Sequence, residues 1–195
     1  KPGEVWPEES IAKMAKQCED NGLIFDVVES IPVHENIKLG RGNVDELLEV
    51  YCENIRRCAK YGVKCVTYNF MPVFDWTRSR LDAPLDDGSN ALVYYKEDVD
   101  KMDPTKMTLP GWDASYSPNE IGSLIKAYQE IGEEGLWENL AYFIKEIIHF
   151  IFNDHKIHFI VVGKEFSFAQ SVELFCVGFV AGYRTRDAFV NILVI

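Results

Sequence analysis

The chain has 195 residues and a mass of 22.3 kDa, enough for one domain of ordinary size. Hydrophobic residues make up 47% of it and charged residues 26%, which excludes a disordered segment. The 20 Lys and Arg residues against 31 Asp and Glu give a net charge of -11. This balance argues against nucleic acid or an anionic membrane as a partner, because both favour basic surfaces.

Five cysteines occur at irregular spacing, with neither a CxxC pair nor a disulfide framework: Cys18, Cys52, Cys58, Cys65 and Cys176. Reduced thiols are typical of a cytoplasmic protein. No basic segment followed by an apolar one comes after Lys1, so we expect no signal peptide. Because the first residue is not Met, we also expect the chain to start inside a longer one.

The first predicted elements are a helix and a strand. Pro7 and the two carboxylates behind it favour a helix start, apolar residues then recur at helical spacing as far as Cys18, and Asn21-Gly22 ends the helix. The apolar run Leu23–Val28 predicts a buried strand. Residues 29–42, with one proline and two glycines, are predicted to form a loop.

A second helix and strand follow. Asn43 and Glu46 have the spacing of a capping box. Val63–Tyr68 predicts the next strand, after a helix end at Gly62. Strand, loop, helix and strand within about forty residues have the size of a right-handed βαβ unit. The apolar face of the helix comprises Leu47, Leu48, Tyr51, Ile55 and Cys58.

The middle of the chain shows no clear helix from Asn69 to Ser117, and Asp86–Asn90 predicts the turn of a hairpin. Ser117 to Glu120 predicts the cap of a helix that runs to about Ile131. After Gly135, a further helix is expected over Leu136–Ile148. Its inward residues would be Leu136, Leu140, Phe143, Ile144 and Ile147.

The composition changes at residue 149. Residues 149–195 hold eight of the twelve Phe and equal numbers of acidic and basic residues, so the whole net charge resides in residues 1–148. Ile157–Val162 fits a strand. Phe166–Tyr183 is apolar but is interrupted by Glu173, which favours a buried or poorly folded segment over a transmembrane span. We therefore divide the chain into residues 1–148 and an atypical C-terminal segment, 149–195.

Two loops, 29–38 and 69–78, follow predicted strands, and parallel α/β folds bind ligands at the carboxyl ends of strands. Both loops are rich in groups that could bind a polyol acid, and an Arg fork suits a carboxylate. The alternative is that these groups satisfy loop backbone or pack, and that a lone His is structural. The candidate substrate-binding residues are Glu29, His34, Asn69, Trp76 and Arg78.

His155 and His158 are three apart, which is a metal-binding pattern only on a helix, and this stretch reads as extended. Chance placement is the simpler explanation, also when Cys176 is added to the set. The chain has no GxGxxG, P-loop, HExxH or GxSxG motif.

Three long stretches resemble one enzyme family: Gly3–Pro7, Val28–Gly40 and Tyr68–Arg78 closely resemble the mannonate dehydratases. Leu109-Pro110-Gly111-Trp112-Asp113 and Leu136-Trp137-Glu138-Asn139-Leu140 are similar to the same family. The resemblance covers residues 1–148. It implies part of a (β/α)8 TIM barrel of the xylose-isomerase-like kind, incomplete here because a full barrel needs about 250 residues. The first barrel strand is expected before Lys1.

The resemblance also implies a metal-dependent carbon-oxygen lyase of glucuronate catabolism. Members remove water from D-mannonate to give 2-keto-3-deoxy-D-gluconate, with Mn²⁺ or Fe²⁺ as the cofactor. A divalent cation stabilises the charge that develops when the proton alpha to the carboxylate is removed. A base takes that proton and an acid helps the β-hydroxyl leave.

This chain departs from the family where the metal ligands are expected. The ligands (two His, a Cys and an Asp) and the proposed acid and base lie in the second half of the barrel. The first belongs to a His-Pro-Asp-Asp-Pro-Pro motif just after the helix ending at Ile148, where this chain reads His149-Phe150-Ile151-Phe152-Asn153-Asp154. No catalytic or metal-binding residue is therefore assigned, and residues 149–195 are hypothesised to be out of frame or non-native.

The resemblance thus predicts a mannonate dehydratase that is inactive as this chain and acts by lineage on D-mannonate. The oligomeric state is left open, a homo-oligomer being one option. A half-barrel would expose strand edges and an apolar inner face, which predicts poor solubility. One alternative is a non-catalytic half-barrel that binds or associates through a capping tail. Another is a barrel rebuilt with His155, His158 and Cys176 as metal ligands.

Overall fold

A computed structural model of the chain describes residues 1–74, 78–102, 117–153 and 160–164, the last of these by backbone only. The chain divides into two units, Lys1–Phe70 with Glu133–Ile195, and Met71–Gly132. The described residues combine helices with a parallel sheet, as the α/β class predicts, and they close no barrel. Within them, no helix has the length and apolar character that a membrane crossing requires.

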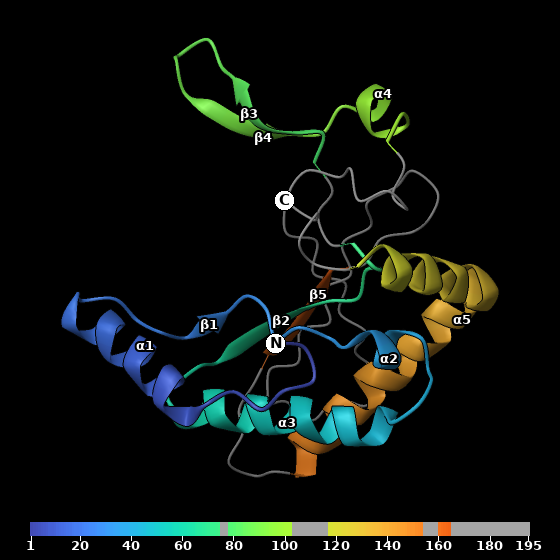
Figure 1. Ribbon diagram of the computed structural model, residues 1–195. Coiled ribbons are helices and arrows are strands. Elements are labelled where there is room, and N and C mark those ends of the chain that lie inside the picture. The colour runs from blue at the N-terminus through green and yellow to red at the C-terminus, as the bar shows by residue number, and fades with distance from the viewer. Residues whose placement is uncertain (75–77, 103–116, 154–159, 165–195) are drawn as a thin grey trace, which may run out of the picture. The chain divides into compact units, whose positions relative to one another are not determined.

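The first unit is built on a three-stranded parallel sheet of β1 (Val27–Val28), β2 (Cys65–Asn69) and β5 (Ile160–Lys164). β2 lies in the centre, with Val28 opposite Val66 on one side and Val161 opposite Val66 on the other (Figure 1). β1, α3 (Val44–Lys60) and β2 form the predicted βαβ unit. The strand predicted at Ile157–Val162 is present, but its first residues lie outside the described ones.

The core of this unit is an aromatic cluster between α3, β2 and α5 (Pro118–Asn153). The Phe143 ring is fully buried and packs edge-on against Tyr51 of α3 at 5.1 Å and Tyr68 of β2 at 5.3 Å between ring centroids. Phe70 lies 5.6 Å away on the same ring. Every residue of the predicted apolar face of α3 is buried, and of the predicted α5 face only Ile144 is half-buried.

The break in α5 lies at Gly132, directly after Ile131, where the first of the two predicted helices ends. Gly132 has φ 64° and ψ -172°, a conformation that costs little only for glycine. At the start of the helix, the main-chain N–H of Ser117 donates to Glu120 Oε2 at 2.9 Å and the N–H of Glu120 donates to Ser117 Oγ at 3.4 Å. The predicted cap therefore forms, and the helix continues past Ile148 to Asn153.

The predicted buried strand Leu23–Val28 is mostly wrong. Residues 21–23 instead close α1 (Glu8–Asp20), where the Leu23 N–H donates to the Cys18 carbonyl at 2.8 Å. Only Val27 and Val28 pair with β2, and Ile24 is 80% exposed. The reason is position, since β1 is the edge of the described sheet and is paired on one side only.

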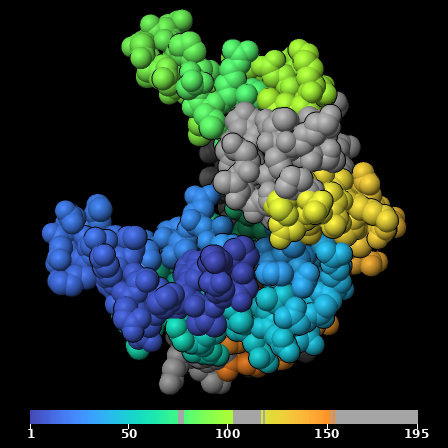
Figure 2. Space-filling view, in the orientation of Figure 1, coloured from blue at the N-terminus to red at the C-terminus, as the bar shows by residue number. Residues whose placement is uncertain are grey.

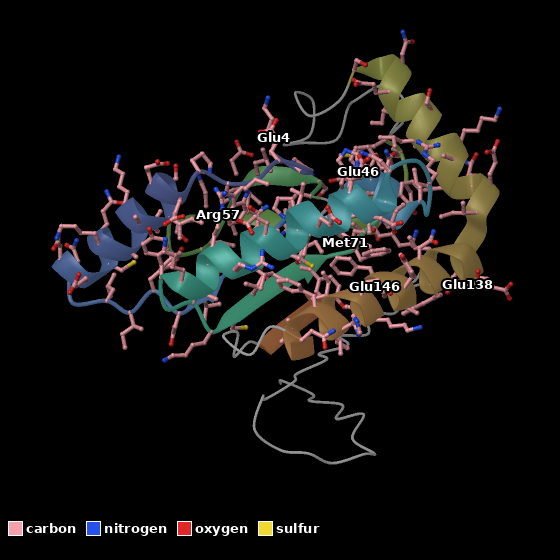
Figure 3. All side chains as sticks on the ribbon, turned by 90° about the horizontal axis from the view of Figure 1, so that it is seen from below. Glu4, Glu46, Arg57, Met71, Glu138 and Glu146 are labelled. Atoms are coloured by element: carbon pink, nitrogen blue, oxygen red, sulfur yellow. The ribbon has the colours of Figure 1, made fainter. Side chains whose placement is uncertain are left out.

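The first residues are fastened to α3. Asn54, almost fully buried, accepts from the Trp6 N–H at 2.7 Å and donates to the Glu4 carbonyl at 3.0 Å. Arg57 donates to the Trp6 carbonyl at 2.7 Å, and Figure 3 shows its side chain on the same side of α3 as Glu4. In Figure 2 the dark blue atoms of this segment lie against the cyan atoms of the following loop and helix. Side-chain amides thus replace the main-chain partners that a strand would offer.

The predicted capping box at Asn43 does not form. The Asn43 side chain makes no cap bond to the backbone and instead donates to Glu46 Oε2 at 3.2 Å.

The second unit contains the predicted hairpin, β3 (Arg80–Pro84) and β4 (Asn90–Val93), which pair antiparallel around Asp86–Ser89. It also contains a one-turn helix, α4 (Lys96–Val99), in a stretch where no helix was predicted.

Candidate functional site

Two predicted site residues meet at the carboxyl edge of the sheet. Glu29 directly follows β1 and Asn69 is the last residue of β2. Asn69 Nδ2 donates to Ser30 Oγ at 3.4 Å, and the Ile31 N–H donates to the Thr67 carbonyl at 3.3 Å, so the loop after β1 continues along β2. Glu29 is exposed and Asn69 half-buried. A carboxylate and an amide therefore lie at one edge, as the strand order predicted.

Thr67 joins this edge and was missed from the sequence. Along β2, Val66 and Tyr68 are buried toward the helices, whereas Cys65, Thr67 and Asn69 are half-buried on the other face. The Thr67 hydroxyl oxygen is buried and has no hydrogen-bond partner within the described part of the chain. A buried hydroxyl without a partner is costly, and the Tyr51 hydroxyl in the core is in the same state within the described residues. The alternation along β2 was the signal that could have identified it.

His34 has mainly local contacts. It is the N-cap of α2 (Glu35–Lys38), and its Nδ1 accepts from the Asn36 N–H at 3.0 Å. A Cβ at Gly3 would lie 2.9 Å from His34 Cδ2, so the ring packs closely on the N-terminal segment. Desolvation lowers the pKa of His34, which keeps the imidazole neutral and able to accept at neutral pH. The ring shapes this loop, and its predicted contact with substrate stays a prediction.

The same loop holds a nearly buried ion pair. Lys38 Nζ lies 2.7 Å from Glu35 Oε1, and both side chains are at most 16% exposed. Asn139 of α5 donates to the Lys38 carbonyl at 2.9 Å and lies against Gly40, where a Cβ would come within 2.4 Å of Asn139 Oδ1. Glycine is therefore required there by both φ and space. The Trp137-Glu138-Asn139 stretch thus has a structural role, which is to hold the loop after β1.

The remaining predicted residues belong to other parts of the chain. Trp76 lies outside the described residues, as do Leu109–Asp113, His155, His158 and Cys176. Arg78 is described and half-buried, but it belongs to the second unit. Their predicted roles stay predictions.

A wide depression of about 1140 Å³ lies between α3 and the second half of α5. It is lined by helix residues such as Glu49, Cys52 and Glu146, of which Glu146 is labelled in Figure 3. Burial raises the pKa of Cys52 to about 12, so its thiol is unreactive at neutral pH. None of the predicted site residues lines this depression.

A metal centre would need several ligand side chains close together. Among the residues that the structure describes, no three His, Cys, Asp or Glu side chains lie close enough together to hold a metal ion. The described residues thus offer no ligand set for the Mn²⁺ or Fe²⁺ that the resemblance implies, and that cofactor stays a prediction.

The family model for D-mannonate dehydratase (UxuA) matches residues 1–161. The chain is 47% identical over 148 residues to the mannonate dehydratase of Oceanobacillus iheyensis and 49% identical over 148 residues to that of Streptococcus uberis. Each alignment covers 75% of this chain and 42% of the relative. The chain thus spans less than half the length of the curated relatives that it matches.

A solved mannonate dehydratase structure is also similar to this chain. The crystal structure of mannonate dehydratase from Streptococcus suis serotype 2 superimposes with a TM-score of 0.68 and 43% sequence identity. The match covers 82% of this chain and 42% of that one. Together, the sequence stretches, the parallel sheet and these comparisons lead to one conclusion: the chain belongs to the D-mannonate dehydratase family.

Proposed function

We propose that this chain represents the first part of a TIM-barrel mannonate dehydratase and supplies substrate-binding groups for the dehydration of D-mannonate to 2-keto-3-deoxy-D-gluconate. The observation that supports it best is the cluster of Glu29, Thr67 and Asn69 at the carboxyl edge of parallel strands. The βαβ unit has the size and the parallel strand pairing of a barrel segment. A barrel would continue this sheet beyond its two edges.

The chemistry of the edge suits a sugar acid. The Glu29 carboxylate accepts hydrogen bonds, the Asn69 amide both donates and accepts, and the Thr67 hydroxyl lacks a partner among the described residues. A polyol chain offers donors and acceptors to all three. Glu29 would contact hydroxyl groups rather than the substrate carboxylate, because like charges repel. We assign the carboxylate to Arg78, with Trp76 as an apolar wall and His34 as a further binding residue.

We further propose that this chain does not dehydrate mannonate by itself. Its sequence lacks the His-Pro-Asp-Asp-Pro-Pro motif, and the described residues do not form a metal site. The chemical step would need groups that the described residues do not provide. A cytoplasmic location is consistent with the free thiols of the described cysteines.

Mutations in a full-length relative test the binding proposal. In the Streptococcus uberis mannonate dehydratase, the residues aligned with Glu29 and Asn69 would be changed to Gln and Ala, one at a time. We expect kcat/KM to fall about 10- to 100-fold, mainly through KM, because each change removes hydrogen bonds to a bound hydroxyl. The matched control is Gln at the position aligned with Glu9, an exposed carboxylate of α1. An unchanged kcat/KM in both site variants would refute the proposed site.

An assay of this chain tests the second proposal. The purified protein is incubated with D-mannonate and Mn²⁺, and 2-keto-3-deoxy-D-gluconate is measured beside the Streptococcus uberis enzyme. We expect no turnover above the metal-only blank. Turnover that follows the amount of chain added would show that it carries a complete active site, and would contradict the proposal.

A further inference from the structure

His34 is the one histidine in residues 1–148, although the chain contains four. Histidine is the side chain whose ordinary pKa places its change of charge between about pH 5 and pH 8. His34 lies in the loop between β1 and α3, directly before the single-turn helix α2. A change of charge at this position therefore acts on the backbone of that loop.

The hydrogen bond of the His34 ring requires the neutral form. Nδ1 accepts from the Asn36 main-chain N–H at 3.0 Å, which assigns the ring proton to Nε2. The opposite side of the ring packs on Gly3, where a Cβ would come within 2.9 Å of Cδ2, so the ring has little space to turn. A protonated ring carries an N–H at both nitrogens, and Nδ1–H would then face the Asn36 N–H as a second donor. Protonation thus removes the bond and adds a repulsion.

Helix α2 depends on this bond more than a long helix would. It has four residues, Glu35–Lys38, and His34 is its N-cap. A single turn is marginal by itself, because fixing its backbone is repaid by few hydrogen bonds. The C-terminal end is fastened separately, since Asn139 of α5 donates to the Lys38 carbonyl at 2.9 Å. Loss of the cap should therefore open the first turn of α2 and leave its C-terminal end in place.

The surroundings of His34 oppose its protonation. Desolvation lowers the pKa of the ring, and the Lys38 ammonium lowers it further. Glu35 acts in the opposite direction, but its carboxylate lies 2.7 Å from that same ammonium. Lys1 of the N-terminal segment and Tyr51 of α3 line the same small cavity as His34. Lys1 brings a further positive charge, whereas burial raises the pKa of Tyr51 and keeps its hydroxyl neutral.

We propose that His34 makes the cap of α2 pH-dependent: the neutral ring holds the first turn of the helix, and the protonated ring releases it. Because the capped loop disfavours the proton, the open loop binds it more readily. The cap is therefore present above about pH 6.5, the ordinary pKa of histidine, and is lost as the pH falls below that value. This proposal concerns the fold of the loop and is independent of the proposed dehydratase activity.

Amide exchange in the full chain, followed by NMR between about pH 7.5 and pH 5, tests the proposal. The exchange rate of the Asn36 N–H is divided into its intrinsic rate at each pH to give a protection factor. The ring signals of His34 in the same samples report its protonation. We expect the protection of Asn36 to fall about fivefold as His34 is protonated, because one N-cap bond is lost. Constant protection of Asn36, or a ring that stays neutral at pH 5, would overturn the proposal.

The variant His34→Asn separates the cap from the charge. An Asn side chain also caps helices, and its oxygen accepts at every pH, so the protection of Asn36 should change by less than about twofold across the range. His34→Ala should leave this N–H weakly protected at both ends of the range. The matched control is His149→Asn, the same change at an exposed histidine of α5, which should keep the fivefold fall. A fall that persists in His34→Asn, or that disappears in His149→Asn, would refute the role of His34.

Discussion

Helices α1 and α3 have similar sequence patterns but different surroundings. Both repeat apolar residues at helical spacing, and both begin with acidic residues that suit the positive end of the helix dipole. In α3 seven residues are buried, whereas in α1 only Ile11 is buried, and Met14, on the same face, is 49% exposed. A helical pattern therefore predicts the helix and its apolar face, but not what covers that face.

The reason lies in the position of each helix. α3 connects two paired strands and packs on the Phe143 cluster, so elements from both sides of the sequence cover it. α1 precedes the edge strand and is held mainly at its ends. There, Lys60 and Tyr61 bond Glu8, the Tyr61 hydroxyl at 2.9 Å. β1 and β2 differ in the same way, since β2 is paired on both sides and β1 on one.

The largest effect should come from the centre of the first unit. Phe143→Ala removes a fully buried ring that contacts three other aromatic rings. We expect a loss of about 3–5 kcal/mol in the free energy of unfolding, through lost burial and the cavity that remains. Urea denaturation followed by circular dichroism measures it. Tyr142→Ala, the exposed neighbour, is the control, and an equal loss there would contradict this account of the core.

The clamp of the N-terminal segment should have a smaller effect. Asn54→Ala removes the acceptor of the Trp6 N–H and the donor to the Glu4 carbonyl, and leaves both groups part-buried. We expect a loss of about 1–3 kcal/mol, together with faster proteolysis between residues 1 and 8. Asn21→Ala, which removes an exposed bond at the end of α1, should cost much less. Unchanged proteolysis in Asn54→Ala would show that the segment is held by other contacts.

The free energy of unfolding should fall at alkaline pH, within a range set by two buried cysteines. Burial raises the pKa of Cys52 from 9.0 to about 12 and that of Cys58 to about 11. Above pH 9 the unfolded chain therefore loses these protons first, so stability falls as pH rises from about 9 to 11. With two thiols the slope should approach about 2–3 kcal/mol per pH unit. Thermal unfolding across this window measures it.

The matching control compares variants that lose the buried cysteines of α3 with a variant that loses the cysteine of α1. Cys52→Ala combined with Cys58→Ala should flatten the pH dependence between pH 9 and 11, whereas Cys18→Ala on half-exposed α1 should leave it unchanged. The opposite result would mean that other groups, such as Tyr51, whose pKa burial also raises, dominate the window.

The smallest effect should come from α1. Met14→Ala changes a half-exposed side chain without creating a cavity, so the free energy of unfolding should change by less than about 0.5 kcal/mol. The measurement is the same denaturation curve used for Phe143→Ala. A loss above about 2 kcal/mol would show that the Met14 face is covered, and the contrast between α1 and α3 would then be wrong.

Local rules predicted much of the fold. The two long helices of the first unit, the βαβ order, the cap at Ser117 and the hairpin turn at Asp86–Ser89 all agree with the structure, because each depends on neighbouring residues. The failures are of another kind. The strand at Leu23–Val28 lacked a second partner, and the capping box at Asn43 did not form because the Asn43 side chain bonds Glu46 instead of the backbone.

The candidate site likewise has features that the local sequence predicted and features that it did not. Its loops were predicted from strand ends, and Glu29 and Asn69 do lie at one edge of the sheet. The alternation along β2 could have placed Thr67 on the Asn69 face, but its burial without a hydrogen-bond partner among the described residues was known only from the structure. His34 caps α2 through the neighbouring Asn36 N–H and also packs closely on Gly3, thirty-one residues away in sequence.

By itself, the sequence determined the family, the α/β class and most element positions, since long matching stretches and periodic patterns are properties of neighbouring residues. The tertiary structure alone decided which apolar faces are covered, which loops are held by Asn54 and Asn139, and that the Thr67 hydroxyl is buried. These properties arise when distant segments meet. Burial and hydrogen-bond satisfaction depend on what surrounds a residue in space, and that surrounding is set by packing rather than by sequence neighbours.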